Sequence, residues 1–312
     1  MIVLNSIHKI NLPTVIALGN FDSMHLGHKE LIKEAVEIAK KKNYISVVFT
    51  FDELPINVIS GRKKIKNVLT KEEKFAEIEK LGVDVIVNAH FDKHIQGMSP
   101  RDFAYEILKK YLNCDTAVCG YNYSFGYMGH GNATILTNLG RQFGYYTEVM
   151  EDFKLGDVSV SSTMIRGLLS SGKVSEYEKY TGRKYSISGK VIEGNHLGTR
   201  MGYPTINLNL SDDMALPVNG VYVTNVSVNG KWYRSVTNVG NKPTIGNYGK
   251  NAETHIFDFE GNLYGADIKV EFVDFVRPEY TFESIDALER QIAKDCEVAK
   301  HYFDNSQEAF QS

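Results

Sequence analysis

The hydrophobic pattern of this chain changes once, near Lys184, and this change constrains the fold more than any other feature. Before it, short apolar runs alternate with segments of helical period, as in 14–19, then 28–41, then 45–51. After it, the helical period disappears until the last segment, and short runs of alternating apolar and polar residues replace it. One chain therefore contains two regions that require two different kinds of sheet.

The first region predicts an α/β fold. Strand and helix in alternation give a parallel sheet with helices on both faces. Thr70 and Glu73 have the spacing of a capping box, and Ser99 before Pro100 marks another helix start. In such sheets, ligands bind beyond the carboxyl ends of the strands. The remaining strands of this region are predicted at 84–88, 116–120 and 145–150.

The second region predicts an antiparallel sheet that closes into a small barrel. Asn229-Gly230 is a strong signal for a two-residue hairpin turn, and residues 260–262 form a second turn signal. The strands are predicted at 185–191, 220–228, 232–238, 254–259 and 267–272. One amphipathic helix ends the chain, and its inner stripe is predicted to contain Ile285, Leu288, Ile292, Cys296 and Ala299. We expect two domains, 1–180 and 181–312.

Composition narrows the function. The chain has 312 residues, 43% of them hydrophobic and 23% charged, which is typical of globular proteins. The net charge of −3 gives no reason to expect a nucleic-acid partner. Three cysteines without a CxxC pair argue against a disulfide framework or a zinc site. No signal peptide or membrane span is recognisable, so we expect a cytoplasmic protein. The oligomeric state stays open.

The segment 19–28, which reads GNFDSMHLGH, joins the first predicted strand to the first predicted helix. A helix start offers free N–H groups and a positive dipole end to phosphate, and His25 and His28 add further donors. Nucleotidyl transfer needs charge stabilisation around the α-phosphate rather than a nucleophile on the protein. We therefore predict a nucleotide site that includes Gly19, Asn20, Phe21, Asp22, His25, Gly27 and His28.

Two other interpretations of the histidine pair stay open. His25 and His28 could merely cap the helix and face solvent. They could also bind a metal ion, although the sequence offers no third ligand nearby.

A second phosphate-binding feature follows the last predicted strand of the first region. Ser161, Ser162 and Thr163 place hydroxyls at a helix start. Arg166 adds a guanidinium, which can bind phosphate through two parallel bonds. The same hydroxyls also suit an ordinary helix cap, so this segment alone does not decide between the two functions.

A glycine-rich loop opens the β-rich region. Gly198 and Gly202 lie at its two ends, and Pro204, Thr205 and Asn207 follow. Such a loop can wrap phosphates, while a threonine hydroxyl and an asparagine carbonyl suit Mg²⁺, a hard cation. The alternative is a hairpin loop in which Pro204 sets a turn. We predict a second nucleotide site here, with Thr205 and Asn207 as metal ligands.

The motifs resemble a known family in both regions. The HxGH segment at 25–28 and SSTMIR at 161–166 resemble the nucleotidyltransferase superfamily, although the lysine-rich KMSKS loop of class I aminoacyl-tRNA synthetases is missing. With GYNYSFG at 120–126, they resemble the adenylyltransferase half of bacterial bifunctional riboflavin kinase/FAD synthetases. The second region resembles riboflavin kinase at four motifs: NVGNKPT at 238–244, ETHIFDF at 253–259, NLYG at 262–265 and RPE at 277–279.

The resemblance implies a Rossmann-like nucleotidyltransferase domain followed by a riboflavin kinase-like barrel that ends in a helix. The barrel would convert riboflavin and ATP into FMN and ADP with Mg²⁺, and the first domain would convert FMN and ATP into FAD and pyrophosphate. It assigns the catalytic base to Glu253 and a contact with flavin or nucleotide to Asn122, and it places Arg277 over the flavin. Tyr123 and Phe125 could stack on a ligand or pack in the core.

The chain departs from the family pattern at two places. Members commonly have Gly-Val where this chain has Ser23-Met24. Many members also have a lysine or arginine at the position of Tyr127-Met128. This chain has neither residue there and so lacks a possible phosphate partner. Two other functions remain: an enzyme with only one working domain, and a flavin-binding regulatory protein without turnover. The intact motifs in both halves argue against both.

Overall fold

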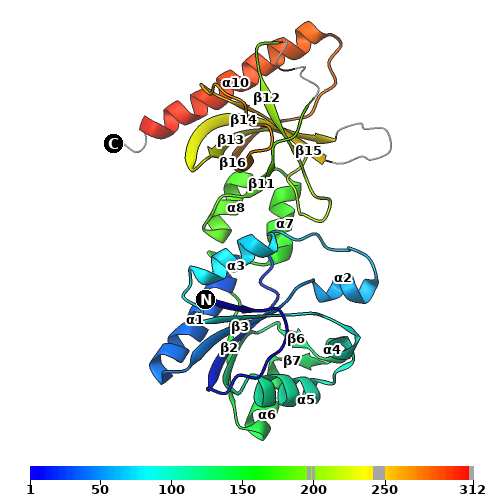
Figure 1. Cartoon of the computed structure of the whole chain (residues 1–312), viewed down its shortest axis with the longest axis vertical. Coiled ribbons are helices and arrows are strands. Elements are labelled where there is room, and N and C mark those ends of the chain that lie inside the picture. Colours follow the sequence, from blue (N-terminus) through cyan, green and yellow to red (C-terminus); the bar gives the residue numbers. More distant parts are fainter. Residues whose placement is uncertain (195–197, 199–200, 242–249, 309–312) are drawn as a thin grey trace. The chain divides into compact units, whose positions relative to one another are not determined.

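The computed structural model describes residues 1–194, 198, 201–241 and 250–308. The chain divides into two compact units, Met1–Ser162 and Thr163–Ser312 (Figure 1). The domain boundary expected at residue 180 stays a prediction, because compactness alone does not show which segment folds by itself. No helix in the described part of the chain is long and apolar enough to cross a membrane.

The first unit contains a six-stranded parallel sheet in the order β1-β4-β3-β2-β5-β8. The first crossovers run outward from β2 in one direction and the later ones in the other, so β2 and β5 are neighbours at the point where the order reverses. The predicted parallel sheet is confirmed. Its strands are β1 (Ile2–Leu4), β2 (Thr14–Leu18), β3 (Ile45–Phe51), β4 (Val85–Ala89), β5 (Cys114–Gly120) and β8 (Tyr146–Met150).

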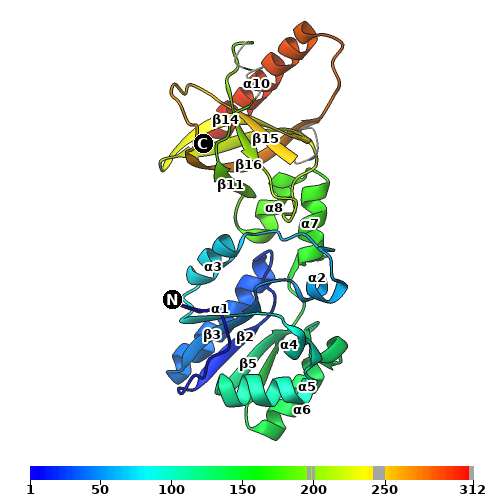
Figure 2. The same cartoon turned by 45° about the vertical axis from the view of Figure 1, so that its right-hand side comes forward.

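Helices cover both faces of this sheet (Figure 2). Val15 and Val48 pack on one face with α1 and α3, and Ile16 and Val47 pack on the other with η1 and α6. The helices are α1 (Leu26–Lys42), α2 (Pro55–Ser60), α3 (Lys71–Glu79), α4 (Lys93–Gly97), α5 (Pro100–Asp102), η1 (Phe103–Tyr111), η2 (Tyr127–Gly129) and α6 (Ala133–Phe143). Two short strand pairs are β6 (Ser124–Phe125) with β7 (Gly131–Asn132), and β9 (Lys154–Leu155) with β10 (Val158–Ser159).

The second unit begins with two helices and continues as an antiparallel sheet in the order β11-β16-β13-β14-β15-β12. A bridge between Ile192 and Asn207 links the two edges and closes the sheet toward a barrel, as predicted. The elements are α7 (Ser162–Ser170), α8 (Val174–Thr181), β11 (Ser186–Lys190), β12 (Thr205–Asn209), β13 (Gly220–Val228), β14 (Lys231–Asn241), β15 (Lys250–Ile256), β16 (Asp267–Pro278) and α10 (Ile285–Glu308).

The turn between β13 and β14 is the predicted two-residue hairpin. Asn229 and Gly230 have φ values of 49° and 81°, and Val228 pairs with Lys231. Two consecutive left-handed residues match the right-handed twist of the paired strands. The sequence signal therefore fixes the register of the longest hairpin in this sheet.

Helix α10 packs on the outer face of β13 and β14 (Figure 1). Cys296 and Ala299 are buried there against Val223 and Val236, as the predicted stripe requires. Ile285 was wrongly placed on that stripe, since its side chain is 61% exposed. It is the first residue of the helix, and burial begins further along, so the first turn contributes little to the core.

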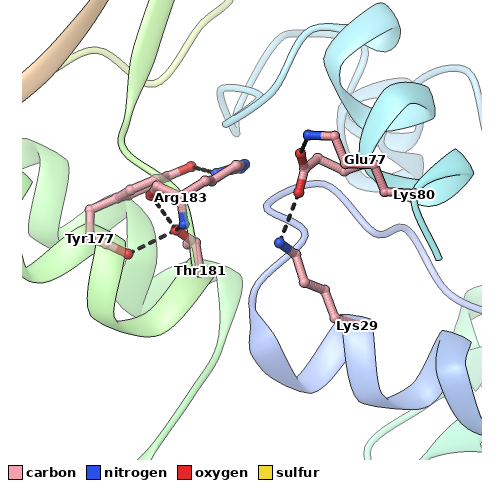
Figure 3. Close-up of polar contacts among 6 residues, drawn as sticks. All are labelled: Lys29, Glu77, Lys80, Tyr177, Thr181 and Arg183. Atoms are coloured by element: carbon pink, nitrogen blue, oxygen red, sulfur yellow. Dashed lines mark hydrogen bonds and ion pairs between the residues drawn. The ribbon is translucent and has the colours of Figure 1, made fainter. Parts of the chain in front are cut away.

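Side-chain hydrogen bonds hold the segment between α8 and the first barrel strand. The Thr181 hydroxyl oxygen lies within hydrogen-bonding distance of two backbone carbonyl oxygens, those of Tyr177 and Arg183, at 2.9 Å each (Figure 3). The Arg183 guanidinium donates to the Tyr177 hydroxyl and lies over the Tyr177 ring. These bonds fix the end of α8 where the chain enters β11.

Candidate functional sites

The loop between β2 and α1 has an unusual backbone. Phe21 and Met24 both have left-handed φ values, 50° and 43°, and both side chains are fully buried. Such conformations cost free energy in residues other than glycine and persist only where surrounding contacts hold them. Helix α1 follows directly after this loop. It starts at Leu26, two residues earlier than the sequence pattern predicts, with His25 as its N-cap.

The two histidines form a stacked pair at the start of α1. The ring centroids of His25 and His28 are 3.7 Å apart, at an interplanar angle of 19°. The His28 backbone N–H donates to Nδ1 of His25 at 3.2 Å, so the proton of a neutral His25 ring lies on Nε2. Nδ1 of His28 is buried and lacks a partner. The pair therefore retains hydrogen-bonding capacity.

Burial keeps both rings neutral. It lowers the pKa of His25 to about 4. Burial and the neighbouring His25 together hold the pKa of His28 well below its usual value. His25 does cap the helix, but it is only 7% exposed, which contradicts the interpretation that the pair faces solvent. Among the described residues, no third His, Cys, Asp or Glu completes a metal site with them.

The other predicted residues of this loop contact the protein. The carbonyl oxygen of Asn20 accepts the Thr50 hydroxyl at 3.0 Å, and the buried Asp22 carboxylate accepts the Val68 N–H at 3.1 Å. A Cβ on Gly27 would lie 2.9 Å from Cβ of Phe153. A Cβ on Gly19 would lie 2.9 Å from the Phe21 ring. Both glycines are thus required by packing as well as by any ligand.

The motif around Asn122 divides into exposed and buried residues. Asn122 is exposed after β5, where it can meet a ligand. Phe125 is 6% exposed and belongs to the core, and Tyr123 stacks on it with centroids 5.6 Å apart. Core packing is therefore the correct interpretation for Phe125. Tyr127 and Met128 are exposed in η2, and Met128 has a left-handed φ of 52°.

The hydroxyl-rich motif is the start of helix α7, as predicted. Oγ of Ser162 lies 2.9 Å from Oγ of Ser23, within the first unit. Ser23 is one of the departures from the family pattern. Its hydroxyl contact joins the loop between β2 and α1 (residues 19–25, here called the histidine loop) directly to Ser162. Ser161 precedes the helix, while Thr163 and Arg166 belong to the second unit.

Two lysines near the start of α1 and the end of α3, Lys29 and Lys80, belong to no motif in the sequence. Figure 3 shows Glu77 of α3 between Lys29 and Lys80, with N–O distances of 2.8 and 2.5 Å. Burial would raise the pKa of Glu77, but hydrogen bonds and charges from the two lysines outweigh it and lower the pKa to about 2. This ion cluster ties α3 to the first turns of α1.

The second unit contains a cavity of about 280 Å³ between the barrel wall and α10. Predicted residues from separate segments meet in it: Gly198 from the glycine-rich loop, Thr205 from β12, Glu253 from β15 and Arg277 from β16. Val221 and Val236 form part of the barrel wall, and Leu288 and Ile292 face the cavity from α10. The cavity combines an apolar surface with a few convergent polar groups, as ligand sites do.

Strand pairing places further polar side chains next to Glu253, which lines the cavity. Asn207 and Glu253 are opposite each other in the register of β12 and β15. Nδ2 of Asn251 donates to Oδ1 of Asn207 at 2.9 Å and lies 3.3 Å from Oε1 of Glu253. Oδ1 of Asn251 is buried without a partner. Side-chain oxygens of Asn207, Asn251 and Glu253 therefore lie close together.

These oxygens fit Mg²⁺. A threonine hydroxyl, asparagine carbonyls and a carboxylate are the ligands that a hard cation prefers. The unpartnered oxygen of Asn251 adds a donor that the protein leaves unsatisfied. The sequence analysis missed Asn251, although it lies two residues before Glu253 and so on the same face of β15.

The glycine-rich loop is held tightly at both ends. A Cβ on Gly198 would lie 2.4 Å from the Tyr203 carbonyl oxygen, and Gly202 has a φ of 80°. The Pro204 carbonyl oxygen accepts Nδ1 of His255 at 2.8 Å. His255 was also missed, and it pairs with Thr205 across the strands. Residues 199 and 200, between Gly198 and Gly202, and residues 242–244 of the NVGNKPT motif lie outside the described residues.

Arg277 contacts α10 through a buried ion pair. Its Nε and Nη2 bind the Asp295 carboxylate, at distances from 2.7 to 3.1 Å, and Nη1 donates to the Pro278 carbonyl oxygen. The guanidinium lies 5.1 Å from the ring centre of Tyr280 and 5.7 Å from that of Phe282. Most of its donors are thus engaged within the protein, and its planar face packs on aromatic rings.

Comparison with known proteins finds two different family matches, one in each part of the chain. The sequence model described as FAD synthetase matches residues 7–164, and the one described as riboflavin kinase matches 181–303. The chain is 33% identical to the bifunctional riboflavin kinase/FMN adenylyltransferase of Buchnera aphidicola from Schizaphis graminum, over 96% of this chain and 97% of that protein. It is 36% identical to the Bacillus subtilis protein of that name, over 94% and 93%.

A solved structure from Streptococcus pneumoniae, named a macrolide-efflux protein, shares the fold. Its TM-score is 0.88 at 29% identity, and the match covers 96% of this chain and 99% of that one. The likeness extends over both units, as do the family matches and the relatives. The chain belongs to the bifunctional riboflavin kinase/FMN adenylyltransferase family.

Proposed function

We propose that each unit carries one ATP-dependent step of flavin cofactor synthesis. The second unit phosphorylates riboflavin to FMN and releases ADP. The first unit transfers the adenylyl group of a second ATP to FMN, giving FAD and pyrophosphate. The observation that supports the assignment most is the pairing of Asn207 with Glu253, which lines the cavity, because a kinase needs a base and phosphate-neutralising ligands side by side.

In the kinase step, Glu253 accepts the proton of the riboflavin primary alcohol as this oxygen attacks the γ-phosphorus of ATP. Gly198, Gly202 and Pro204 shape the loop that wraps the nucleotide phosphates. Thr205 and Asn207 would hold Mg²⁺, which supplies charge neutralisation on the phosphates when bound.

Arg277 contributes to the kinase site through its partners. Asp295 fixes the guanidinium, and Tyr280 and Phe282 pack on its face beside the cavity. A planar stack of this kind suits the edge of an isoalloxazine ring. We therefore assign Arg277 to the flavin side of the cavity rather than to the phosphates.

In the adenylyl step, the FMN phosphate attacks the α-phosphorus of ATP and pyrophosphate leaves. Neutral His25 and His28 donate hydrogen bonds to the phosphates at the start of α1, together with the loop formed by Gly19, Asn20, Phe21, Asp22 and Gly27. Ser161 and Ser162 provide hydroxyls for a second phosphate clamp, and Asn122 contacts the flavin or the nucleotide. The part of Thr163 and Arg166 in this clamp stays a prediction from the sequence.

The partners are small molecules: riboflavin, FMN, FAD, ATP, ADP and pyrophosphate. The net charge of −3 disfavours a nucleic-acid partner. All three cysteines are buried and unpaired, which supports the reducing cytoplasm as the compartment.

The test is turnover by the purified chain. With riboflavin, ATP and Mg²⁺, chromatography should show FMN first and FAD later, and with FMN supplied instead it should show FAD directly. Formation of FMN alone would mean that only the second unit works. Flavin binding without either product would identify a regulatory protein and refute the proposal.

A further inference from the structure

Lys74 of α3 extends to the carboxyl end of β3. Its Nζ lies 3.2 Å from the Phe51 carbonyl oxygen and 3.4 Å from Oγ1 of Thr50. The Thr50 side chain is fully buried, and its hydroxyl contacts the carbonyl oxygen of Asn20 at 3.0 Å. Lys74 is therefore two contacts away from the loop that leads to His25.

The direction of each bond in this chain follows from its groups. An ammonium can only donate and a carbonyl oxygen can only accept. Thr50 has one hydroxyl proton, which must go to Asn20, so its oxygen is left to accept from Lys74. Because each group in the series requires the next, a relay runs from α3 through β3 to the histidine loop.

One of the charges around Lys74, that of Asp22, belongs to the loop between β2 and α1. Burial lowers the pKa of Lys74 to about 8, while Asp22 and Asp52 act to raise it and Lys71 to lower it. Asp22 lies in the histidine loop and also accepts the Val68 N–H, just before α3. The ammonium thus acts on the loop at two points, through Thr50 at Asn20 and through its charge at Asp22.

The loop needs such support. Its two buried left-handed residues, Phe21 and Met24, are strained and persist only where the surroundings hold them. Asn20 and Asp22 are the neighbours of Phe21 on either side. A contact that fixes both neighbours fixes the strained residue between them.

We propose that Lys74 is a positioning residue for adenylyl transfer, which holds the histidine loop in its binding conformation through Thr50 and Asn20. This inference rests on the proposed function of that loop. Lys74 touches neither the nucleotide nor the flavin in this scheme, and it acts only through the backbone that carries His25 and His28.

The test compares three variants in the full chain. Lys74→Met keeps the length of the side chain without its ammonium, and Thr50→Val keeps the shape without the hydroxyl. Lys41→Met removes an exposed lysine from the last turn of α1 as a control. In Lys74→Met, kcat/KM for ATP in FAD formation should fall about 10- to 100-fold, as for other misplaced sites. FMN formation by the second unit should not change, nor should either activity in Lys41→Met.

The pH profile separates positioning from general stability. In the unaltered protein, FAD formation should decline as the pH rises through about 8, where the Lys74 ammonium is lost. Asp22, Asp52 and Lys71 are the charged groups that face it. Lys74→Met should lack this decline, and Lys74→Arg should keep activity to higher pH.

Two results would overturn the inference: wild-type kinetics in both Lys74→Met and Thr50→Val, or an unaltered pH decline in Lys74→Met. A His28→Ala variant is measured alongside. If it stays active, the proposed site itself is wrong; if it is inactive while Lys74→Met is normal, only the role of Lys74 is wrong. Because the pH profile of the unaltered protein needs no variant, poor folding of Lys74→Met would not remove the test.

Discussion

Asn207 and Glu253 face each other across β12 and β15, and the Asn251 amide donates to the Asn207 side chain between them. Glu253 is therefore fixed beside the oxygens that suit Mg²⁺. If Glu253 is the base, as proposed, the kinase step should be sensitive to the loss of its charge but tolerant of small changes further along the cavity.

Glu253→Gln should block the kinase step selectively. The amide keeps the size of the side chain and can still pair with Asn251, but it cannot accept the alcohol proton. Riboflavin phosphorylation should fall by roughly 10²–10⁴-fold, the usual contribution of a general base. FAD formation from supplied FMN should be unchanged, and chromatography of the flavins measures both steps. Loss of both steps in a folded variant would contradict the division of labour.

His28→Ala should have the opposite effect. Removal of one preorganised donor to a developing charge costs about 10²–10³-fold in rate. The reaction should stop at FMN when riboflavin is supplied, with the kinase rate intact. An unchanged rate of FAD formation would show that the stacked histidines serve the structure of the loop and not the chemistry.

The pH dependence of FAD formation should contain no step from these histidines between pH 6 and 8. The folded pKa of His25 is about 4, and that of His28 is also far below its usual value, so both are neutral throughout this range. Their folded pKa values lie below the unfolded ones, so they favour unfolding only as the pH falls below about 6.5. A rate that changes around pH 6.5 in the unaltered protein, but not in His28→Ala, would refute neutral donors.

The periodicity of the sequence predicted the architecture well, because each element is locally consistent. The capping box at Thr70 and Glu73 and the hairpin at Asn229 both rest on short-range hydrogen bonding and φ preferences, and both are present. Burial at helix ends is harder to predict, since it depends on where the helix leaves the sheet. Ile285 fits the helical stripe but lies beyond the packed face.

The sites were predictable only in part. Motifs in the sequence predict roles for Glu253 and His28. Lys74 and His255 contact residues that are far away in the sequence, and no local pattern marks such contacts. The same limit applies to Phe125, whose place in the core is decided by the strand pair that contains it. Ser23 gains its meaning only through Ser162, 139 positions later.

Ser23→Gly tests that contact by restoring the glycine common in the family. Loss of the hydroxyl removes the 2.9 Å contact with Ser162 and should cost about 0.5–1.5 kcal/mol of stability. Because Ser162 starts α7, FAD formation should also decline slightly while FMN formation does not. Ser170→Gly, at the exposed end of the same helix, serves as the control. A variant as stable and active as the parent would mean that the hydroxyl contact contributes nothing.

Glu77→Gln should destabilise the first unit, and the effect should depend on pH. Glu77 is buried, its charge is bound by Lys29 and Lys80, and the amide would leave Lys29 without its counter-ion; hydrogen bonds to charged groups contribute about 1.5–3 kcal/mol. The folded pKa of about 2 lies below the usual value of 4.5, so the stabilisation is fully present above about pH 4.5 and is lost as the pH falls toward 2. Thermal melting of the variant and its parent should therefore differ at pH 7 and converge in acid. An equal difference at both pH values would show that packing, and not the carboxylate charge, carries the contribution of Glu77.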